Sequence, residues 1–507
     1  MAIQQLFVEA SQVSVRYWVA ALFAPLLAYT LGTIIYRLGP LHPFAKIPGP
    51  LLNRITYAPL VWHSYKGDEA QYVHKLHQRY GNTVRIAPSS VDFTEVAALK
   101  GIYLEKGGFY KSHYYNNFDI DGHASIFSNT DLASRAARAK VVLPLFSITN
   151  VKLGYKPFKD SLRRYLKRFK EEKETGRVNV LDLARGMSID AVTEYLFGIR
   201  YGAFKDEEES GTSPSVNATC EPKMSASDVV DNFISTSRLW YLSVWLYNLA
   251  DKLDGIIYPN PGAEVSTEIV NEYADRVIAA AQEQITQQKD KSQLTFPARL
   301  LRAGISPEET RSHCKDIIFA GTDTIGMNLA TVCFMLAKYP RVYDRLHEEV
   351  NSAEIEKEED IQVLPYLNAV VKEGLRMSMT NPCRLPREVP ERGWTYKETY
   401  YPPGTIVSCS AYEMHFSTEM FEKPFEFIPE RWDSATDDMN KSMMAFGLGN
   451  RQCIARGMSM LDMHDVVYHL VKEDVLRGAK PVKERIEILE GFSSKVVEGH
   501  VDLVWDS

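Results

Sequence analysis

The chain has 507 residues, of which 45% are hydrophobic and 11% aromatic, and it carries a net charge of −7. A chain of this length and composition can bury a large core. Its negative charge and the lack of a long basic run argue against nucleic acid as the main partner. Its six cysteines are widely spaced and form no CxxC pair, which is typical of a reducing compartment.

The N-terminal segment predicts a membrane anchor. Residues 17–36 contain no charged side chain and lie between Arg16 and Arg37. About 20 apolar residues are enough for a helix to span a bilayer. Positive residues follow this stretch, so the positive-inside rule places the C-terminal part in the cytosol. We therefore predict an anchor over residues 1–37 with a transmembrane helix at about 17–36. A cleaved signal peptide and a buried core helix are the alternatives.

The rest of the chain predicts one helix-rich domain. Residues 38–50 end in Ile-Pro-Gly-Pro, a stiff turn that predicts a hinge. Residues 51–507 contain no repeat and no domain-sized linker, so we expect a single domain. Alternating segments near 83–93 and 400–410 predict strands, whereas most of 151–379 has helical apolar spacing. The predicted fold class is mainly α with small β-sheets (α+β).

One long helix has clear start and stop signals. Ser306, Pro307 and Glu309 form a capping box with proline at the first helical position. Apolar spacing continues to Lys338, and Pro340 ends the helix. At about 1.5 Å per residue this helix is roughly 47 Å long and must cross the whole domain.

The middle of that helix has the sequence Ala-Gly-Thr-Asp-Thr at residues 320–324. Glycine inside a helix costs about 1 kcal/mol relative to alanine, so its presence needs an explanation. Ala320, Gly321 and Thr324 are expected to share one face and to leave a notch for a flat ring, with Asp323 and Thr324 as a proton relay. The alternative is a close helix crossing that selects small residues, with Thr324 bonded to the carbonyl four residues before it.

Charged motifs follow further along the chain. Glu373 and Arg376 lie on one face of a predicted helix, and a pair of this kind contributes only about 0.2–0.5 kcal/mol when exposed. The segment Arg-Leu-Pro-Arg ends at Arg387, and Phe-Ile-Pro-Glu-Arg-Trp contains Arg431. A basic surface turn is the alternative interpretation of the segment that ends at Arg387.

A cysteine near the C-terminal end carries the strongest functional signal. Cys453 lies in the sequence Phe-Gly-Leu-Gly-Asn-Arg-Gln-Cys-Ile-Ala at residues 446–455, just before a predicted helix over 456–470. A glycine turn with inward N–H groups and a helix N-terminus both favour a thiolate. Thiolate ligation of haem iron favours O–O cleavage, while Phe446 can cover a porphyrin face and Arg451 can pair with a propionate. The alternative is a buried free cysteine.

This loop resembles the cysteine loop of the cytochrome P450 family. Phe446, Gly449, Arg451 and Cys453 match the family pattern, and Ala455 departs from it because glycine is usual there. The other motifs resemble, in the family's order, its oxygen-activation segment, its Glu-x-x-Arg helix and its proline-flanked arginine. The resemblance begins near the hinge, continues to the C-terminus, and leans towards fungal enzymes of secondary metabolism.

The resemblance implies a haem-thiolate monooxygenase with Cys453 as the axial ligand. It also assigns roles to other residues: Asp323 and Thr324 as catalytic proton relay, Phe446 under the haem, Arg451 and Arg387 at its propionates, and Glu373, Arg376 and Arg431 in a buried charge network that holds the cysteine loop. The segment 131–146 resembles a second propionate-contacting helix. Its match is poorer, but Arg135 and Arg138 keep it basic.

Partners follow from the same resemblance. It implies electrons from NADPH through NADPH–cytochrome P450 reductase, and single-pass attachment to the endoplasmic reticulum membrane with a cytosolic catalytic domain. Aromatic residues in 110–126 and 233–247 suggest an apolar, bulky small-molecule substrate, although they are equally compatible with core or membrane-facing positions. A haem-thiolate isomerase or dehydratase, a non-catalytic haem-binding protein and a membrane-tethered scaffold without haem are the alternatives.

Overall fold

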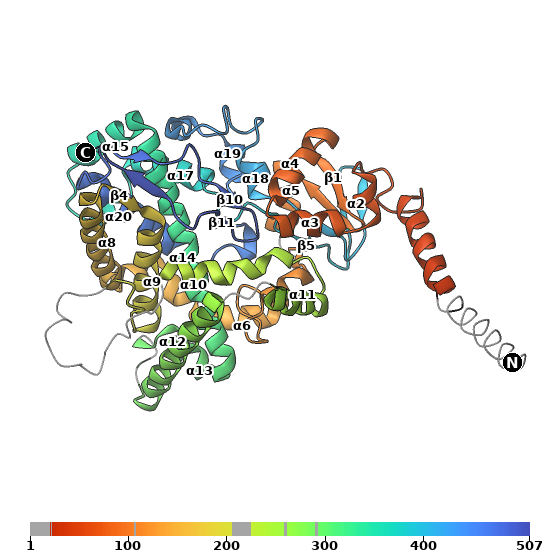
Figure 1. Ribbon diagram of the computed structural model, residues 1–507, viewed down its shortest axis with the longest axis horizontal. Helices are drawn as coiled ribbons and strands as arrows, with labels where there is room; N and C mark the ends of the chain where they lie inside the picture. The colour runs from red at the N-terminus through yellow and green to blue at the C-terminus, as the bar shows by residue number, and fades with distance from the viewer. Residues whose placement is uncertain are drawn as a thin grey trace, which may run out of the picture.

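The structure is a computed structural model that describes residues 21, 23–105, 108–204, 225–257, 261–288, 290 and 293–506. Figure 1 shows a helix-rich part that holds α8, α9, α14, α15, α17 and α20, and a smaller part in which α2 to α5 lie around β1. The N-terminal helix projects away from both parts. The fold is mainly helical with small sheets, as predicted.

The α-helices of the described residues are α2 Leu51–Ile55, α3 Ala58–Lys66, α4 Glu69–Tyr80, α5 Val96–Leu99, α6 Leu132–Val142, α7 Ile148–Leu153, α8 Lys156–Glu174, α9 Val180–Phe197, α10 Ala226–Ile234, α11 Val244–Ile257, α12 Pro261–Thr286, α13 Phe296–Arg302, α14 Pro307–Lys338, α15 Pro340–Ser352, α16 Glu358–Ile361, α17 Pro365–Met377, α18 Ala411–His415, α19 Asp437–Lys441 and α20 Arg456–Lys472. The strands are β1 Thr83–Ala87, β2 Ser90–Phe93, β3 Tyr110–Lys111, β4 Arg177–Asn179, β5 Arg387–Glu388, β6 Trp394–Tyr396, β7 Thr399–Tyr401, β8 Ile406–Ser408, β9 Lys480–Pro481, β10 Ile488–Leu489, β11 Lys495–Val496 and β12 Asp502–Val504.

The largest sheet brings together distant parts of the chain. Its strand order is β1-β2-β8-β5-β3, with β2 and β8 parallel and the other neighbours antiparallel. Lys111 of β3 lies directly opposite Arg387 of β5. Directly opposed residues of an antiparallel pair place their side chains on the same face. This pairing therefore sets two cations side by side although 276 positions separate them in the sequence numbering (387 − 111).

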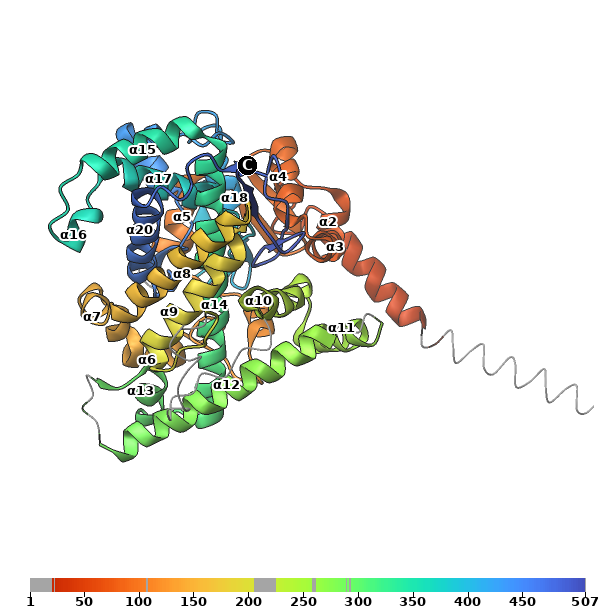
Figure 2. The ribbon, with the colours of Figure 1, turned by 60° about the vertical axis from the view of Figure 1, so that its left-hand side comes forward.

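The long helix α14 has the predicted ends. Ser306 caps it by accepting a hydrogen bond from the Glu309 N–H at 3.1 Å, Pro307 is its first residue, and Lys338 is its last of 32. In both ribbon views α14 runs through the middle of the helical part, next to α9 (Figures 1 and 2). It is apolar and long enough to cross a membrane, but 72% of its most apolar window is buried, so it is a core helix.

Two glycines allow α9 and α14 to approach closely. A Cβ at Gly321 would lie 3.2 Å from a methyl carbon of Val192, and one at Gly326 would lie 2.3 Å from the Arg185 side chain. Gly321 therefore faces α9. The prediction that Gly321 shares the notch face with Ala320 and Thr324 is wrong, because the close crossing accounts for this glycine.

An apolar helix, residues 23–38, precedes the folded part. Its large side chains are exposed, among them Phe23, Leu26 and Ile35. The predicted transmembrane helix at 17–36 falls partly outside the described residues, which leave out 1–20 and 22. Arg85 donates a hydrogen bond to the Arg37 carbonyl at 3.0 Å, so the end of this helix is tied to β1.

Candidate active site

The cysteine loop is shaped by its two glycines. Gly447 and Gly449 both have positive φ, at 63° and 68°. A Cβ at Gly449 would lie 1.9 Å from the Tyr103 carbonyl oxygen, so no other residue fits there without a shift of the backbone. The Cys453 N–H donates to the Phe446 carbonyl at 2.9 Å and closes the loop. Phe446 is half-buried and packs against the main core.

The position of Cys453 combines an exposed residue with a thiol that protein surrounds. The residue is exposed, and yet burial raises the pKa of its thiol. The N–H groups of Ala455 and Arg456, at the start of α20, lower the pKa but do not outweigh burial. The expectation that the turn and the helix N-terminus favour a thiolate is confirmed in direction, although burial outweighs their effect. A bound metal cation deprotonates a coordinating thiol outright, which supplies what these N–H groups do not.

The helix α14 presents an accessible stripe in its middle, which includes Ala320 and Thr324. Ala320 is exposed and Thr324 is partly exposed, whereas Thr322 and Asp323 are buried. The Thr324 hydroxyl donates to the Ala320 carbonyl at 2.8 Å. This hydrogen bond to the carbonyl four residues back is the one expected if the segment 320–324 served a close helix crossing. Thr324 makes it and is still partly exposed.

Asp323 is held by a buried ionic chain. Its Oδ1 lies 2.6 Å from Arg185 Nη2, and Arg185 Nη1 lies 3.0 Å from Asp231 Oδ1. Lys495 is 3.9 Å from the other Asp231 oxygen and is more exposed. Burial raises the pKa of Asp323 while Arg185 opposes that rise, and Asp323 Oδ2 is buried without a hydrogen-bond partner. Arg185 is therefore the partner that positions Asp323, a contact that sequence reasoning missed.

Four cations gather near the cysteine loop: Lys111, Arg135, Arg387 and Arg451. Burial, together with the nearby Arg135 and Arg387, lowers the pKa of Arg451 to about 10. Burial also lowers the pKa of Lys111 strongly, with Arg387 and Arg451 contributing. Among the described residues, no carboxylate forms an ion pair with any of the four, and Nε of both Arg135 and Arg451 is buried without a partner.

Sequence reasoning missed Lys111. Its ammonium donates to the Phe127 carbonyl and lies 3.8 Å from the ring centroids of Tyr115 and Phe127. The available signal was a lone lysine in an aromatic stretch, because a cation between aromatic residues is seldom a solvated one. Its strand register with Arg387 could not be read from the sequence.

Two other arginines lie outside this cluster. Arg138 pairs with Glu309 of α14 and donates to the Ser134 hydroxyl at 2.8 Å. Its predicted propionate role is corrected accordingly, because its guanidinium already has a carboxylate. Arg384, three residues before Arg387, is buried and lies 3.2 Å from Glu69. The two arginines of the Arg-Leu-Pro-Arg segment therefore have different partners.

These residues fit a haem. The four clustered cations lack carboxylate partners, and burying unpaired charge is costly, so the two propionates of a haem would complete the cluster. In the described part of the chain no three His, Cys, Asp or Glu side chains group to hold a metal. A single cysteine would suit an iron that a porphyrin already holds through its four nitrogens.

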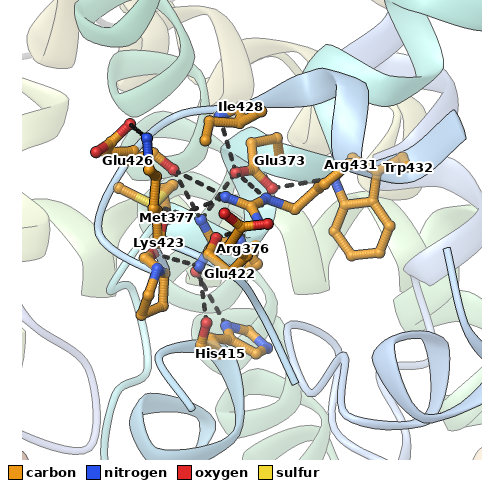
Figure 3. Close-up of polar contacts among 11 residues, drawn as sticks. Glu373, Arg376, Met377, His415, Glu422, Lys423, Glu426, Ile428, Arg431 and Trp432 are labelled. Carbon is orange, nitrogen blue, oxygen red and sulfur yellow. Dashed lines mark hydrogen bonds and ion pairs between the residues drawn. The ribbon is translucent and has the colours of Figure 1, made fainter. Parts of the chain in front are cut away.

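The predicted charge network is formed around Glu373 (Figure 3). Arg376 donates to both of its carboxylate oxygens at 2.9 and 2.8 Å, and Arg431 donates to Oε1 at 3.0 Å. Trp432 Nε1 and the Ile428 N–H add bonds at 3.0 and 3.1 Å. Glu373 and Arg376 are both 0% exposed. The carboxylate is therefore satisfied by Arg376 of its own helix and by three groups of the segment 428–432.

His415 links this network to the cysteine loop. Arg376 donates to the His415 carbonyl at 2.7 Å, and the His415 Nδ1 lies 3.1 Å from the Arg376 carbonyl. His415 Nε2 accepts the Met444 N–H at 2.9 Å, two residues before Phe446. Burial and Arg376 lower the pKa of His415 to about 3, so the ring is neutral and can accept that bond. No sequence motif contained this histidine.

Comparisons with known proteins agree with this geometry. A family model described as Cytochrome P450 matches residues 48–473. The chain is 34% identical over 494 residues to cytochrome P450 monooxygenase mfmF of Annulohypoxylon moriforme, covering 94% of this chain and 97% of that protein. It is 29% identical to pisatin demethylase of Fusarium vanettenii, with 88% and 86% covered. It is 25% identical to fusicoccadiene C-8 hydroxylase of Alternaria brassicicola, with 87% and 86% covered.

The match spans all four sequence motifs. It includes α14 with residues 320–324, the helix α17 with Glu373, the segment of Arg431 and the loop of Cys453. Enzymes of this family are haem-dependent oxidoreductases that take electrons from a redox partner and act on small molecules. The chain belongs to the cytochrome P450 family and is a haem monooxygenase.

Proposed function

We propose that this enzyme oxidises an apolar small molecule in a fungal secondary-metabolite pathway, with electrons from NADPH through NADPH–cytochrome P450 reductase. The observation that carries the proposal is the cluster of cations without carboxylate partners, to which Arg451 of the cysteine loop belongs. The exposed Cys453 and the accessible stripe of α14 support it. The fungal relatives named as a hydroxylase and a demethylase support small-molecule oxidation.

The proposed roles follow the positions of the side chains. Cys453 would ligate the haem iron, Phe446 would pack against the haem, and Arg387 and Arg451 would bind the propionates together with Arg135 and Lys111. When bound, a thiolate-ligated haem supplies the oxidation chemistry. The protein's own part is to place the ligand, neutralise the propionates and keep the substrate against α14.

Asp323 and Thr324 are the proposed proton relay. The Thr324 hydroxyl lies on the accessible stripe of α14 and can transfer a proton. Asp323 is the acid next to it in the sequence. Asp323 Oδ2 is free of protein hydrogen bonds, so it can bind water or the threonine hydroxyl while Oδ1 stays with Arg185. A haem-thiolate isomerase or dehydratase would use neither group.

Replacing Thr324 by valine is expected to preserve haem binding and to divert electrons. Valine keeps the shape of threonine and removes the hydroxyl, and a positioned proton donor typically contributes about 10²–10⁴-fold. We expect product formed per NADPH to fall by about tenfold or more while hydrogen peroxide rises. Coupled turnover is measured as product and peroxide against NADPH consumed.

Thr331→Val is the matched control. Thr331 lies on the same helix and also donates to a carbonyl four residues back, at 2.8 Å, but it is buried away from the accessible stripe. It should leave the coupling ratio unchanged. Equal coupling in Thr324→Val and the unaltered enzyme would remove Thr324 from the relay.

The test of the whole function uses the full-length protein with its reductase in membranes. Fungal apolar metabolites are screened for a shift in the haem absorbance, and each binder is then incubated with NADPH and isotopically labelled O₂. We expect a product that contains one labelled oxygen atom or has lost a group by oxidation. Turnover of a binder without NADPH would instead support the isomerase or dehydratase.

We also propose the membrane arrangement. Residues 1–37 are the anchor, 38–50 the hinge and 51–507 the catalytic domain, with single-pass attachment to the endoplasmic reticulum and a cytosolic active site. The exposed apolar side chains of residues 23–38 support an anchor because water-exposed groups of this kind favour a bilayer.

Deleting residues 1–36 is expected to release much of the enzyme from membranes and to preserve the haem spectrum. The deletion leaves Arg37, whose carbonyl accepts the bond from Arg85, so the fold of β1 keeps its contact. Membrane fractionation and haem absorbance are measured together. A deletion of residues 1–10 is the control and should stay with the membrane, since it spares the uncharged stretch. Loss of haem in the longer deletion would contradict the assignment of this segment as an anchor only.

A further inference from the structure

A carboxylate that the proposed proton relay does not use lies on the same side of α14. Asp316 precedes Ala320 by four residues and Thr324 by eight, and residues four apart lie on neighbouring positions of one helix face. All three are at least partly accessible, while their neighbours Lys315, Ile318 and Asp323 are buried. At about 1.5 Å per residue, Asp316 lies roughly 6 Å along the helix from Ala320.

The other carboxylates of this helix that reach inward have arginine partners. Glu309 pairs with Arg138, and Asp323 lies 2.6 Å from Arg185. Asp316 has no ion pair with any described residue. Among the described residues, its side-chain hydrogen-bond partner is Ser125. Ser125 Oγ in turn accepts the N–H groups of Phe127 and Ser128, both at 3.1 Å, so its hydrogen is directed to the carboxylate.

The charged groups around Asp316 leave its free lone pairs available. Lys111 attracts Asp316 electrostatically. The Lys111 ammonium is itself engaged by the Phe127 carbonyl and by two aromatic rings. The charges of Arg387, Arg451 and Arg135 act on Lys111. Burial raises the pKa of Asp316 to about 6, so the group is still mainly ionised at neutral pH. A carboxylate has about four acceptor positions, and Ser125 fills one.

An aromatic cluster includes Phe127, whose ring centroid lies 3.8 Å from the ammonium of Lys111, the cation that attracts Asp316. Phe127, two residues from Ser125, lies 5.3 Å from Phe492 and 5.7 Å from Phe118 between ring centroids. Trp240 and Tyr115 belong to the same cluster, and Trp240 is 0% exposed. A ligand that reaches Asp316 therefore meets apolar rings on one side and a single strong acceptor on the other. Trp245, by contrast, is 69% exposed and is not part of it.

We infer that Asp316 is a substrate-binding residue, which accepts a hydrogen bond from a hydroxyl or protonated amine carried by an otherwise apolar substrate and so sets which carbon faces the haem. The inference rests on the proposed function, because it requires the substrate to lie against α14. Hydrogen bonds to a charged acceptor are stronger than neutral ones, and an unmatched buried carboxylate disfavours a substrate without a donor.

The test uses iron-ligating probes that share one body. The parent is 4-phenylimidazole, and its derivatives carry a hydroxymethyl or an aminomethyl group on the ring at the meta or para position. Each probe is titrated into the full-length haem-loaded protein, and its Kd is read from the Soret shift. For each derivative the quantity compared is the ratio of the parent's Kd to the derivative's Kd. We expect this ratio, for at least one donor-bearing derivative, to be about tenfold larger in the unaltered protein than in Asp316→Asn. The hydroxyl and amine arms distinguish the two donor chemistries.

Two controls make the result decisive. Asp316→Glu keeps a carboxylate and should keep part of the preference, while Glu308→Gln removes an exposed carboxylate from the start of the same helix and should change no Kd. If Asp316→Asn loses haem, Asp316→Ser is compared in the same way. If the neutral variant shows the same ratio of parent Kd to derivative Kd as the unaltered protein, the inference is overturned. A Soret shift with the parent probe in that variant would show that the haem site itself is intact. A full-length protein without a Soret band would overturn the haem site itself.

Discussion

Cys453→Ala is expected to abolish the thiolate-type spectrum of the reduced, CO-bound protein and to leave no monooxygenase activity. Alanine keeps the backbone of the loop, including the 2.9 Å bond from residue 453 to the Phe446 carbonyl, but removes the sulfur. The four cations near the loop remain, so some haem can still associate through its propionates. Activity should be lost because the thiolate's electron donation, which favours O–O cleavage, is gone.

Cys314→Ala is the matched control for this experiment. Cys314 is a buried free cysteine of α14 whose pKa burial raises, so it contributes packing and no ligand. Its replacement leaves a small cavity, which costs stability, and should preserve the CO spectrum. A thiolate-type spectrum that persists in Cys453→Ala would refute the ligand assignment. Measuring haem per protein in both variants separates loss of the ligand from loss of the fold.

Glu373→Gln is expected to destabilise the enzyme by about 3–5 kcal/mol, because it leaves two buried arginines without their carboxylate. Arg376 and Arg431 both donate to Glu373, and Arg376 is 0% exposed. A loss of this size is a large share of the about 5–15 kcal/mol that stabilises a typical protein. The measurement is the free energy of unfolding from denaturant titration, made beside the haem content.

Haem content should fall together with stability in Glu373→Gln. The network reaches the cysteine loop through His415, which accepts the Met444 N–H, so a shift of Arg376 is passed to the residues before Phe446. The control is Asp437→Asn, which removes an exposed ion pair with Lys441 at 3.2 Å. Exposed pairs of this kind contribute about 0–1 kcal/mol. A similar, small loss in both variants would show that the buried network does not support the loop.

Local signals in the sequence were enough for several elements. The ends of α14 follow from Ser306, Pro307 and Pro340, because capping and proline act on the backbone within one turn. The start of α20 at Arg456 and the strands β1 and β2 were likewise predicted. The segment expected as a strand at 400–410 contains parts of two, β7 and β8, because a turn that begins after Tyr401 interrupts it.

The partners of several side chains could be known only from the tertiary structure. Arg135 and Arg138 are equally basic in the sequence, but only Arg138 finds a carboxylate, Glu309 of a helix 171 positions away. From the sequence, Gly321 could either open a notch or allow a neighbouring helix to approach. The structure shows the second, because a Cβ at this position would lie 3.2 Å from Val192 of α9. Lys111 joined the cationic cluster through the register of β3 with β5.

By itself the sequence determined the family, the glycine-containing cysteine loop and the principal helix, since these depend on residue types at short, fixed spacings. Only the tertiary structure decided which cations lie beside Cys453, which arginine holds Asp323, how His415 ties the charge network to the loop, and that Asp316 shares the accessible stripe of α14. The physical reason is that these properties depend on burial and on partners from distant segments. A charge that is solvated and inconsequential in the unfolded chain becomes costly or useful only once the fold removes its water.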